Sequence, residues 1–118
     1  MMLAALVMLI APDPELPSAA QAGDALLVAW SCRDEDEFTL CDPASQPIGI
    51  SLTRFACRPA APKRGERARA VCDFAGNLER HGIVRAGVRQ PRAEAISAQT
   101  ATFWIIDQAG VTRWRTER

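Results

Sequence analysis

The four cysteines are the residues of this chain with the clearest chemistry. Cys32, Cys41, Cys57 and Cys72 lie in a chain of 118 residues. An even number of cysteines in a short exported chain is typical of two disulfides, because a small domain has a thin core and an oxidising compartment permits the bond. Zinc is less well supported, since no two cysteines are spaced as in a zinc knuckle and the single histidine, His81, lies outside the cluster. The alternative is four buried thiols in a cytosolic protein.

His81 is the only side chain whose ordinary pKa lies near neutrality. It sits beside Gly82 with Glu79 and Arg80 before it, which favours an exposed residue without a catalytic role. No serine occupies a nucleophile elbow, and no glycine spacing is suited to cradling phosphates. The sequence therefore predicts neither an enzyme nor a bound cofactor.

The acidic run at residues 34–37 places four carboxylates together, and these could bind a hard cation such as Ca²⁺. It lacks the ligand spacing and the glycine of an EF-hand, so a solvated loop from Asp34 to Glu37 is favoured. We predict no metal site, with a cation in this run as the alternative.

Five basic residues surround a segment whose prolines and glycine favour a turn. They are Arg58, Lys63, Arg64, Arg67 and Arg69. Cations on a rigid hairpin suit an acidic protein, a polyanionic glycan or lipid phosphates, because little entropy is lost when such a surface docks. The alternative is a solubilising face that balances the acidic residues.

Charge is divided unequally along the chain although the net charge is zero. Residues 1–50 carry eight acidic side chains and one arginine, whereas residues 51–118 carry six acidic and thirteen basic ones. A net charge of zero gives no whole-chain argument for nucleic acid or an anionic membrane as a partner. The two halves could also contact each other within the fold, which would hide the basic residues.

The first 22 residues have the pattern of a secretory leader. The chain begins with eleven uncharged, mostly apolar residues, and Ala20-Gln21-Ala22 places small residues where a signal peptidase reads them. The apolar run is too short to span a bilayer, which takes about 20 residues. We therefore expect a signal peptide at 1–22, a single disulfide-stabilised domain at 23–118, and a periplasmic or secreted location. Because no basic residue precedes the apolar run, the alternative is an N-terminal helix packed on the core or docked to a membrane.

Two stretches of alternating apolar residues predict a first hairpin. Residues 48–58 read as a strand with a phase slip that suggests a bulge near Thr53, and residues 67–74 alternate more regularly. One antiparallel register places Phe55 opposite Phe74.

The same register places Cys57 opposite Cys72. Directly opposed antiparallel residues can meet the Cα separation of a disulfide, which is about 4.4 to 6.8 Å. We therefore predict a Cys57–Cys72 disulfide, and Cys32 is left to pair with Cys41.

A second hairpin is predicted at the end of the chain, where residues 100–106 and 111–116 flank a four-residue turn ending in glycine. Phe103, Ile105 and Trp114 share the face assigned to the core. The expected register pairs Ile106 with Val111, Trp104 with Arg113, and Phe103 with Trp114.

The remaining segments complete an α+β fold. A helix from Asp24 to Trp30, with Asp24 as its N-cap, is expected to pack on the sheet. Residues 77–99 are expected to form a mobile connection that could include a short helix at 92–98. The fold class is thus a small antiparallel sheet of about four strands in two hairpins, with one short helix packed on it and disulfides stapling it.

Together these features favour an exported, non-enzymatic binding or inhibitor-like module that uses its basic hairpin to contact an acidic protein, glycan or envelope component. A cytosolic nucleic-acid or protein interaction domain is the first alternative, although nucleic-acid-binding signatures are absent and no nucleic acid is expected as a partner. A small hydrolase that uses His81 with Glu79 or Asp73 is the second.

Overall fold

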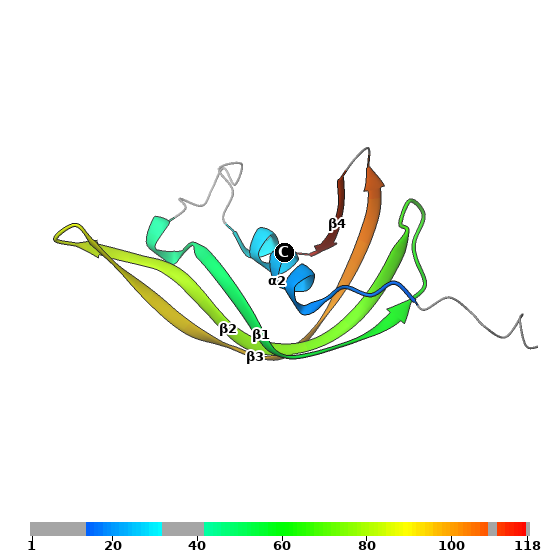
Figure 1. Cartoon of the computed structure of the whole chain (residues 1–118), viewed down its shortest axis with the longest axis horizontal. Coiled ribbons are helices and arrows are strands. Elements are labelled where there is room, and N and C mark those ends of the chain that lie inside the picture. The colour runs from blue at the N-terminus through cyan, green and yellow to red at the C-terminus, as the bar shows by residue number, and fades with distance from the viewer. Residues whose placement is uncertain (1–13, 32–41, 109–110, 118) are drawn as a thin grey trace, which may run out of the picture.

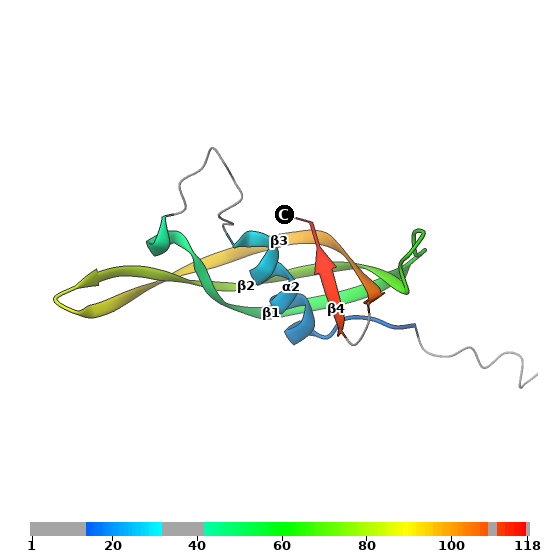
Figure 2. The same ribbon diagram turned by 90° about the horizontal axis from the view of Figure 1, so that it is seen from above.

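The computed structural model describes residues 14–31, 42–108 and 111–117. In chain order the elements are helix α2 (Ala19–Trp30), 3-10 helix η1 (Pro43–Ser45) and strands β1 (Pro47–Ala60), β2 (Ala68–Arg85), β3 (Val88–Gln108) and β4 (Val111–Thr116). The strands form one antiparallel sheet in the order β1-β2-β3-β4. The sheet curves strongly, and α2 lies on its concave side (Figures 1 and 2). The predicted architecture of one helix on a four-stranded antiparallel sheet is confirmed.

Helix α2 begins five residues earlier than the sequence analysis expected. Its N-cap is Ser18, not Asp24: the Ser18 hydroxyl accepts from the Gln21 backbone N–H at 3.1 Å, and the Ser18 N–H donates to the Gln21 side chain at 2.9 Å. This reciprocal capping box satisfies two backbone donors at the helix start. The signal was missed because residues 20–22 were interpreted as a cleavage motif.

One face of α2 is made of small residues and a leucine. The buried residues of this face are Ala22, Gly23, Ala25, Leu26 and Ala29. Small side chains let the helix approach the sheet closely, and Leu26 is the largest of the buried side chains on this face. Leu26 and Phe103 are both almost completely buried in the resulting core. The predicted core face of the last hairpin is therefore the face that α2 covers.

The register of β1 on β2 agrees with the sequence prediction. Phe55 lies opposite Phe74, and the register shifts between Leu52 and Arg54, where Thr53 is the additional residue of a bulge. Gly76 faces this bulge, and a Cβ there would lie 2.1 Å from a backbone oxygen of β1. Only glycine fits this position.

The last hairpin has the predicted core face but a different register. Phe103, Ile105 and Trp114 are buried, as expected. The pairing is shifted by two residues, so that Trp104 lies opposite Arg115 instead of Arg113. The reason is that β3 ends at Gln108 and β4 begins at Val111, so that the turn between them has two residues instead of four. A shift of two leaves Phe103, Ile105 and Trp114 on their predicted face.

The expectation for residues 77–99 was wrong. They form neither a loop nor a helix: β2 continues to Arg85 and β3 starts at Val88. Ala86 and Gly87 connect the strands, both with positive φ, at 50° and 76°, as a tight type I′ turn requires. Figure 1 shows this part of the sheet extending well beyond α2. Residues 83–95 are all exposed, so this part of the sequence lacks the alternation of buried and exposed positions that would have revealed the strands.

We call residues 82–91 the arm. Gly82 is buried at its base, and every other residue of the arm is exposed. A Cβ on Gly82 would lie 1.7 Å from the Gln90 backbone oxygen, and the register shifts here between Arg80 and Ile83. Gly82 therefore forms a bulge that re-aims the arm. None of the helices in the described ranges is long and apolar enough to cross a membrane.

Candidate binding site at the β1–β2 hairpin

The five basic residues singled out in the sequence lie together on the β1–β2 hairpin. Arg58 is near the end of β1 and Arg69 near the start of β2, and the other three lie in or beside the connection between the strands. The strands that carry them are joined covalently and by side-chain interactions. The structure thus places these residues on one element, and their partners decide which of them are available to a ligand.

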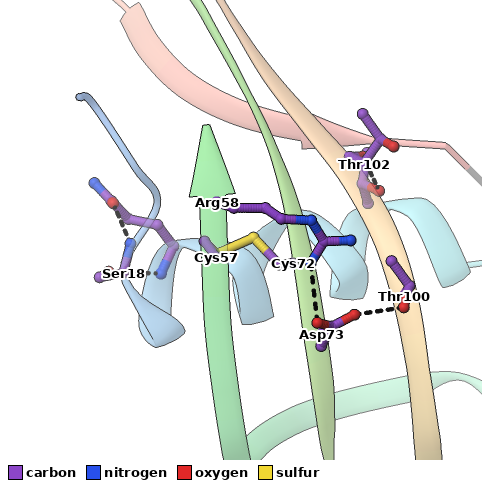
Figure 3. Close-up of a disulfide and its surroundings, with 9 residues drawn as sticks. Ser18, Cys57, Arg58, Cys72, Asp73, Thr100 and Thr102 are labelled. Atoms are coloured by element: carbon purple, nitrogen blue, oxygen red, sulfur yellow. Dashed lines mark hydrogen bonds and ion pairs between the residues drawn. A yellow bond between two sulfur atoms is a disulfide. The ribbon is translucent and has the colours of Figure 1, made fainter. Parts of the chain in front are cut away.

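A disulfide joins Cys57 to Cys72 across the two strands, with the Cα atoms 4.1 Å apart (Figure 3). Cys72 is completely buried and Cys57 packs against the same core. The predicted Cys57–Cys72 pairing is confirmed. The predicted Cys32–Cys41 pair lies outside the described residues.

Arg58 forms a cross-strand ion pair with Asp73 on the side of the sheet away from α2. Its guanidinium lies 3.0 Å from the Asp73 carboxylate, which also accepts a hydrogen bond from the Thr100 hydroxyl of β3 (Figure 3). The Thr100 hydroxyl and then the Arg58 guanidinium hold the pKa of Asp73 below its ordinary value. Both charged side chains are more than half exposed, so the pair adds little stability, but it links three strands.

Arg69 and Glu66 form the best-shielded ion pair of the hairpin. Two guanidinium nitrogens donate to the two carboxylate oxygens at 2.8 and 2.7 Å, and the Lys63 backbone N–H donates to the same carboxylate at 2.9 Å. The hydrogen bonds from Arg69, followed by the one from Lys63, lower the pKa of Glu66 from 4.5 to about 2 against the opposing effect of desolvation. Arg69 also lies over the Trp104 ring, 5.4 Å from its centroid. Arg69 is therefore a structural residue of the hairpin.

Arg67 pairs with Glu15, in the segment that precedes α2. The Arg67 Nε donates to a Glu15 carboxylate oxygen at 2.9 Å, and a second guanidinium nitrogen donates to the other oxygen. This contact joins the acidic and basic halves of the chain at one point. It draws the N-terminal segment onto the start of β2.

Lys63 and Arg64 are the two cations of the cluster that remain exposed at the end of the hairpin. Within the ranges that the structure describes, no acidic side chain forms an ion pair with either of them. Gly65 follows with φ of 87°, which fixes the turn that presents them. We call Lys63 and Arg64 the basic tip.

The other candidate residues are dispersed. His81 lies at the base of the arm, where its backbone N–H donates to the Gln46 carbonyl at 2.8 Å and its ring nitrogen Nδ1 lies 2.9 Å from the Gly82 carbonyl oxygen. Asp73 lies eight residues away along β2, about 25 Å for an extended strand, so the structure does not bring it to His81. The acidic run from Asp34 to Glu37 lies outside the described residues. In the remaining, described part, no three potential metal ligands lie together.

One polar cluster escaped the sequence analysis. At the base of the arm, the Arg80 Nε donates to the Glu94 carboxylate at 2.7 Å, and another of its nitrogens donates to the Ser45 carbonyl at 2.6 Å. The hydrogen bond from Arg80 lowers the pKa of Glu94. These contacts fasten η1 and β3 to β2. The signal was hidden because Glu94 was expected in a loop or helix instead of a strand beside β2.

Comparison of the chain with protein-family models, with curated proteins and with solved structures finds no match.

Proposed function

We propose that the protein is an exported, non-enzymatic binding module whose β1–β2 hairpin contacts an acidic partner. The main support is the contrast among the five basic residues. Arg58 and Arg69 are held by Asp73 and Glu66, which remain in the chain when residues 1–22 are removed, whereas the basic tip is exposed and forms no ion pair with any acidic side chain in the described ranges.

The surroundings of the basic tip favour binding because the hairpin is held in one conformation before a partner arrives. The Cys57–Cys72 disulfide joins its strands, and the ion pair of Glu66 with Arg69 closes the connection that carries the tip. A preorganised surface loses little conformational entropy on association, and its charges increase the rate of encounter with a polyanion. Export to the periplasm or the exterior, after removal of residues 1–22, is part of this proposal, and the disulfide is compatible with it.

Binding to heparin, as a polyanionic probe, tests the role of the basic tip. Replacing Lys63 and Arg64 together by glutamine should weaken binding of the oxidised protein about tenfold at low salt, because both cations lie where the ligand docks. The matched control replaces Arg54 and Arg113, two exposed arginines on other parts of the sheet. Equal loss in both variants would show that binding follows net charge and would refute a specific site.

Export is tested on material made by the host. N-terminal sequencing and thiol counting should show a chain that lacks its first residues and has no thiol open to alkylation before reduction. A product that retains Met1 and has all four thiols reduced would refute export and favour a cytosolic interaction domain. Duplex DNA serves as the second probe in the heparin experiment, and tighter binding to DNA than to heparin would support the same alternative.

A further inference from the structure

The turn of the arm carries three of the most exposed large apolar side chains among the residues that the structure describes. Ile83, Val84 and Val88 are 48%, 59% and 63% exposed. Isolated apolar residues are common on protein surfaces, but these three lie within six consecutive positions at one end of the molecule. Their concentration at the end of a projecting hairpin points to contact with an apolar environment.

The three side chains lie on both faces of the arm. Ile83 pairs with Gln90 and Arg85 pairs with Val88, so these positions share one face because residues two apart in a strand point to the same side. Val84, paired with Arg89, lies on the opposite face. A protein partner docked on one face would leave the apolar group of the other face in water. A medium that surrounds the end of the hairpin would cover both.

The same segment carries only positive charge. Arg85 follows Val84 and Arg89 follows Val88, and no acidic residue occurs from position 80 through 93. Arg89 donates from its guanidinium to the His81 carbonyl at 3.1 Å, which directs its charged end toward the base of the arm. The stems of such arginines can pass along an apolar layer while their charged ends remain among phosphates.

We propose that the arm docks on an anionic phospholipid surface, with Ile83, Val84 and Val88 entering the interface and Arg85 and Arg89 contacting lipid phosphates. Aliphatic side chains on both faces suit the boundary between headgroups and acyl chains, and nearby cations add attraction to anionic lipid. The tight two-residue turn at Ala86 and Gly87 keeps the two strands of the arm paired up to its end. This surface is separate from the basic tip and does not depend on it.

Vesicle sedimentation of the oxidised full chain tests the proposal. The probes are vesicles of phosphatidylcholine alone and of phosphatidylcholine with about 30% phosphatidylglycerol. We expect binding to the anionic vesicles and at least tenfold weaker binding to the neutral ones. Replacing Ile83, Val84 and Val88 by serine should weaken binding to the anionic vesicles about tenfold.

Variants of Arg85 and Arg89 test whether binding requires the positive charge of these side chains or the guanidinium group itself. Replacing Arg85 and Arg89 by glutamine should weaken binding about tenfold, whereas replacing both by lysine should retain most of it, because an ammonium still neutralises a phosphate. The charge control is the variant without Arg54 and Arg113. The apolar control replaces Val28, which is 40% exposed on α2, by serine. Circular dichroism confirms that each variant is folded.

Two results would overturn this proposal. One is the absence of binding to anionic vesicles, and the other is binding that the arm variants and the control variants change equally. Neither result bears on the heparin experiment, since the basic tip is intact in every arm variant. Failure of the proposal for the basic tip can therefore be distinguished from failure of the proposal for the arm.

Discussion

The β1–β2 hairpin and the arm are both antiparallel strand pairs, but they are stabilised in different ways. The first contains a disulfide, a shielded ion pair and buried side chains that contact α2. The second has a tight turn, a glycine bulge and exposed side chains on both faces. Isolated two-stranded hairpins are marginally stable in water, so the arm depends on the sheet at its base. Stability and exposed apolar surface are thus separated along the same strand, β2.

This separation predicts that equivalent truncations differ greatly between the two regions. Leu26→Ala should lower the free energy of unfolding by about 4 kcal/mol, because Leu26 is buried and its loss leaves a cavity in the core. Val84→Ala in the arm should change it by less than about 0.5 kcal/mol. Urea unfolding followed by tryptophan fluorescence measures both. A large effect of Val84→Ala would show that the arm is packed and would remove the contrast.

The disulfide should have the next largest effect. Replacing Cys57 and Cys72 by alanine frees a loop with a sequence separation of 15 and should cost about 3 kcal/mol of unfolding free energy. The measurement belongs in a chain in which Cys32 and Cys41 are serine, so that no other thiol can exchange. Hydrogen exchange within residues 83–90, corrected for global unfolding, should be unaffected. Faster exchange of these amides by local opening would mean that the Cys57–Cys72 disulfide also stabilises the arm.

Acid should weaken the β1–β2 hairpin through Glu66. Because the pKa of Glu66 is about 2 in the folded chain and 4.5 ordinarily, its pair with Arg69 contributes stability above about pH 5, and this contribution is lost as the pH falls toward 2. Glu66→Gln should therefore be less stable than the parent chain at pH 7 and equally stable near pH 2. The arm has no acidic side chain and adds nothing to this dependence.

Urea unfolding at a series of pH values tests the prediction for Glu66, with Arg54→Gln as a control that should differ from the parent by the same amount throughout. A deficit of Glu66→Gln that persisted at pH 2 would assign the effect to packing rather than to ionisation.

The smallest predicted effect is a gain in the arm. Ala86 has a φ of 50°, which a residue with a Cβ adopts at some cost, and asparagine is preferred at this position of a type I′ turn. Ala86→Asn should slow hydrogen exchange of the paired amides in the arm about twofold, which corresponds to about 0.4 kcal/mol. Ala86→Val should accelerate it. The opposite order of the two variants would contradict the assigned turn.

The structure of the β1–β2 hairpin could be predicted from the sequence more accurately than that of the arm. Alternation of apolar residues around Phe55 and Phe74 determined the strand register, the bulge at Thr53 and the Cys57–Cys72 pair, because one face of these strands is buried. The arm has no buried face, and its glycines, which favour loops in general, occupy a bulge and a turn here. Periodicity can reveal only those strands that contact a core.

The five basic residues of the hairpin could be located from the sequence, but which of them form ion pairs could not. Glu66 lies near Arg69 in the sequence, and their pairing depends on the conformation of the connection between the strands. Glu15 lies 52 residues from Arg67, so nothing local indicated that contact. The distinction between held and exposed cations came from tertiary structure alone.

Under the proposed cleavage after Ala22, the position of this residue in α2 makes folding and proteolysis compete. Its peptide bond to Gly23 lies inside a capped helix, and both residues are buried against the sheet. A peptidase needs its substrate in an extended, accessible form, so cleavage there must precede folding. A chain that folds first keeps Ser18 and the Glu15 contact, whereas a chain cut first starts within the helix. Under that proposal, the order of the two events determines which of the two products accumulates.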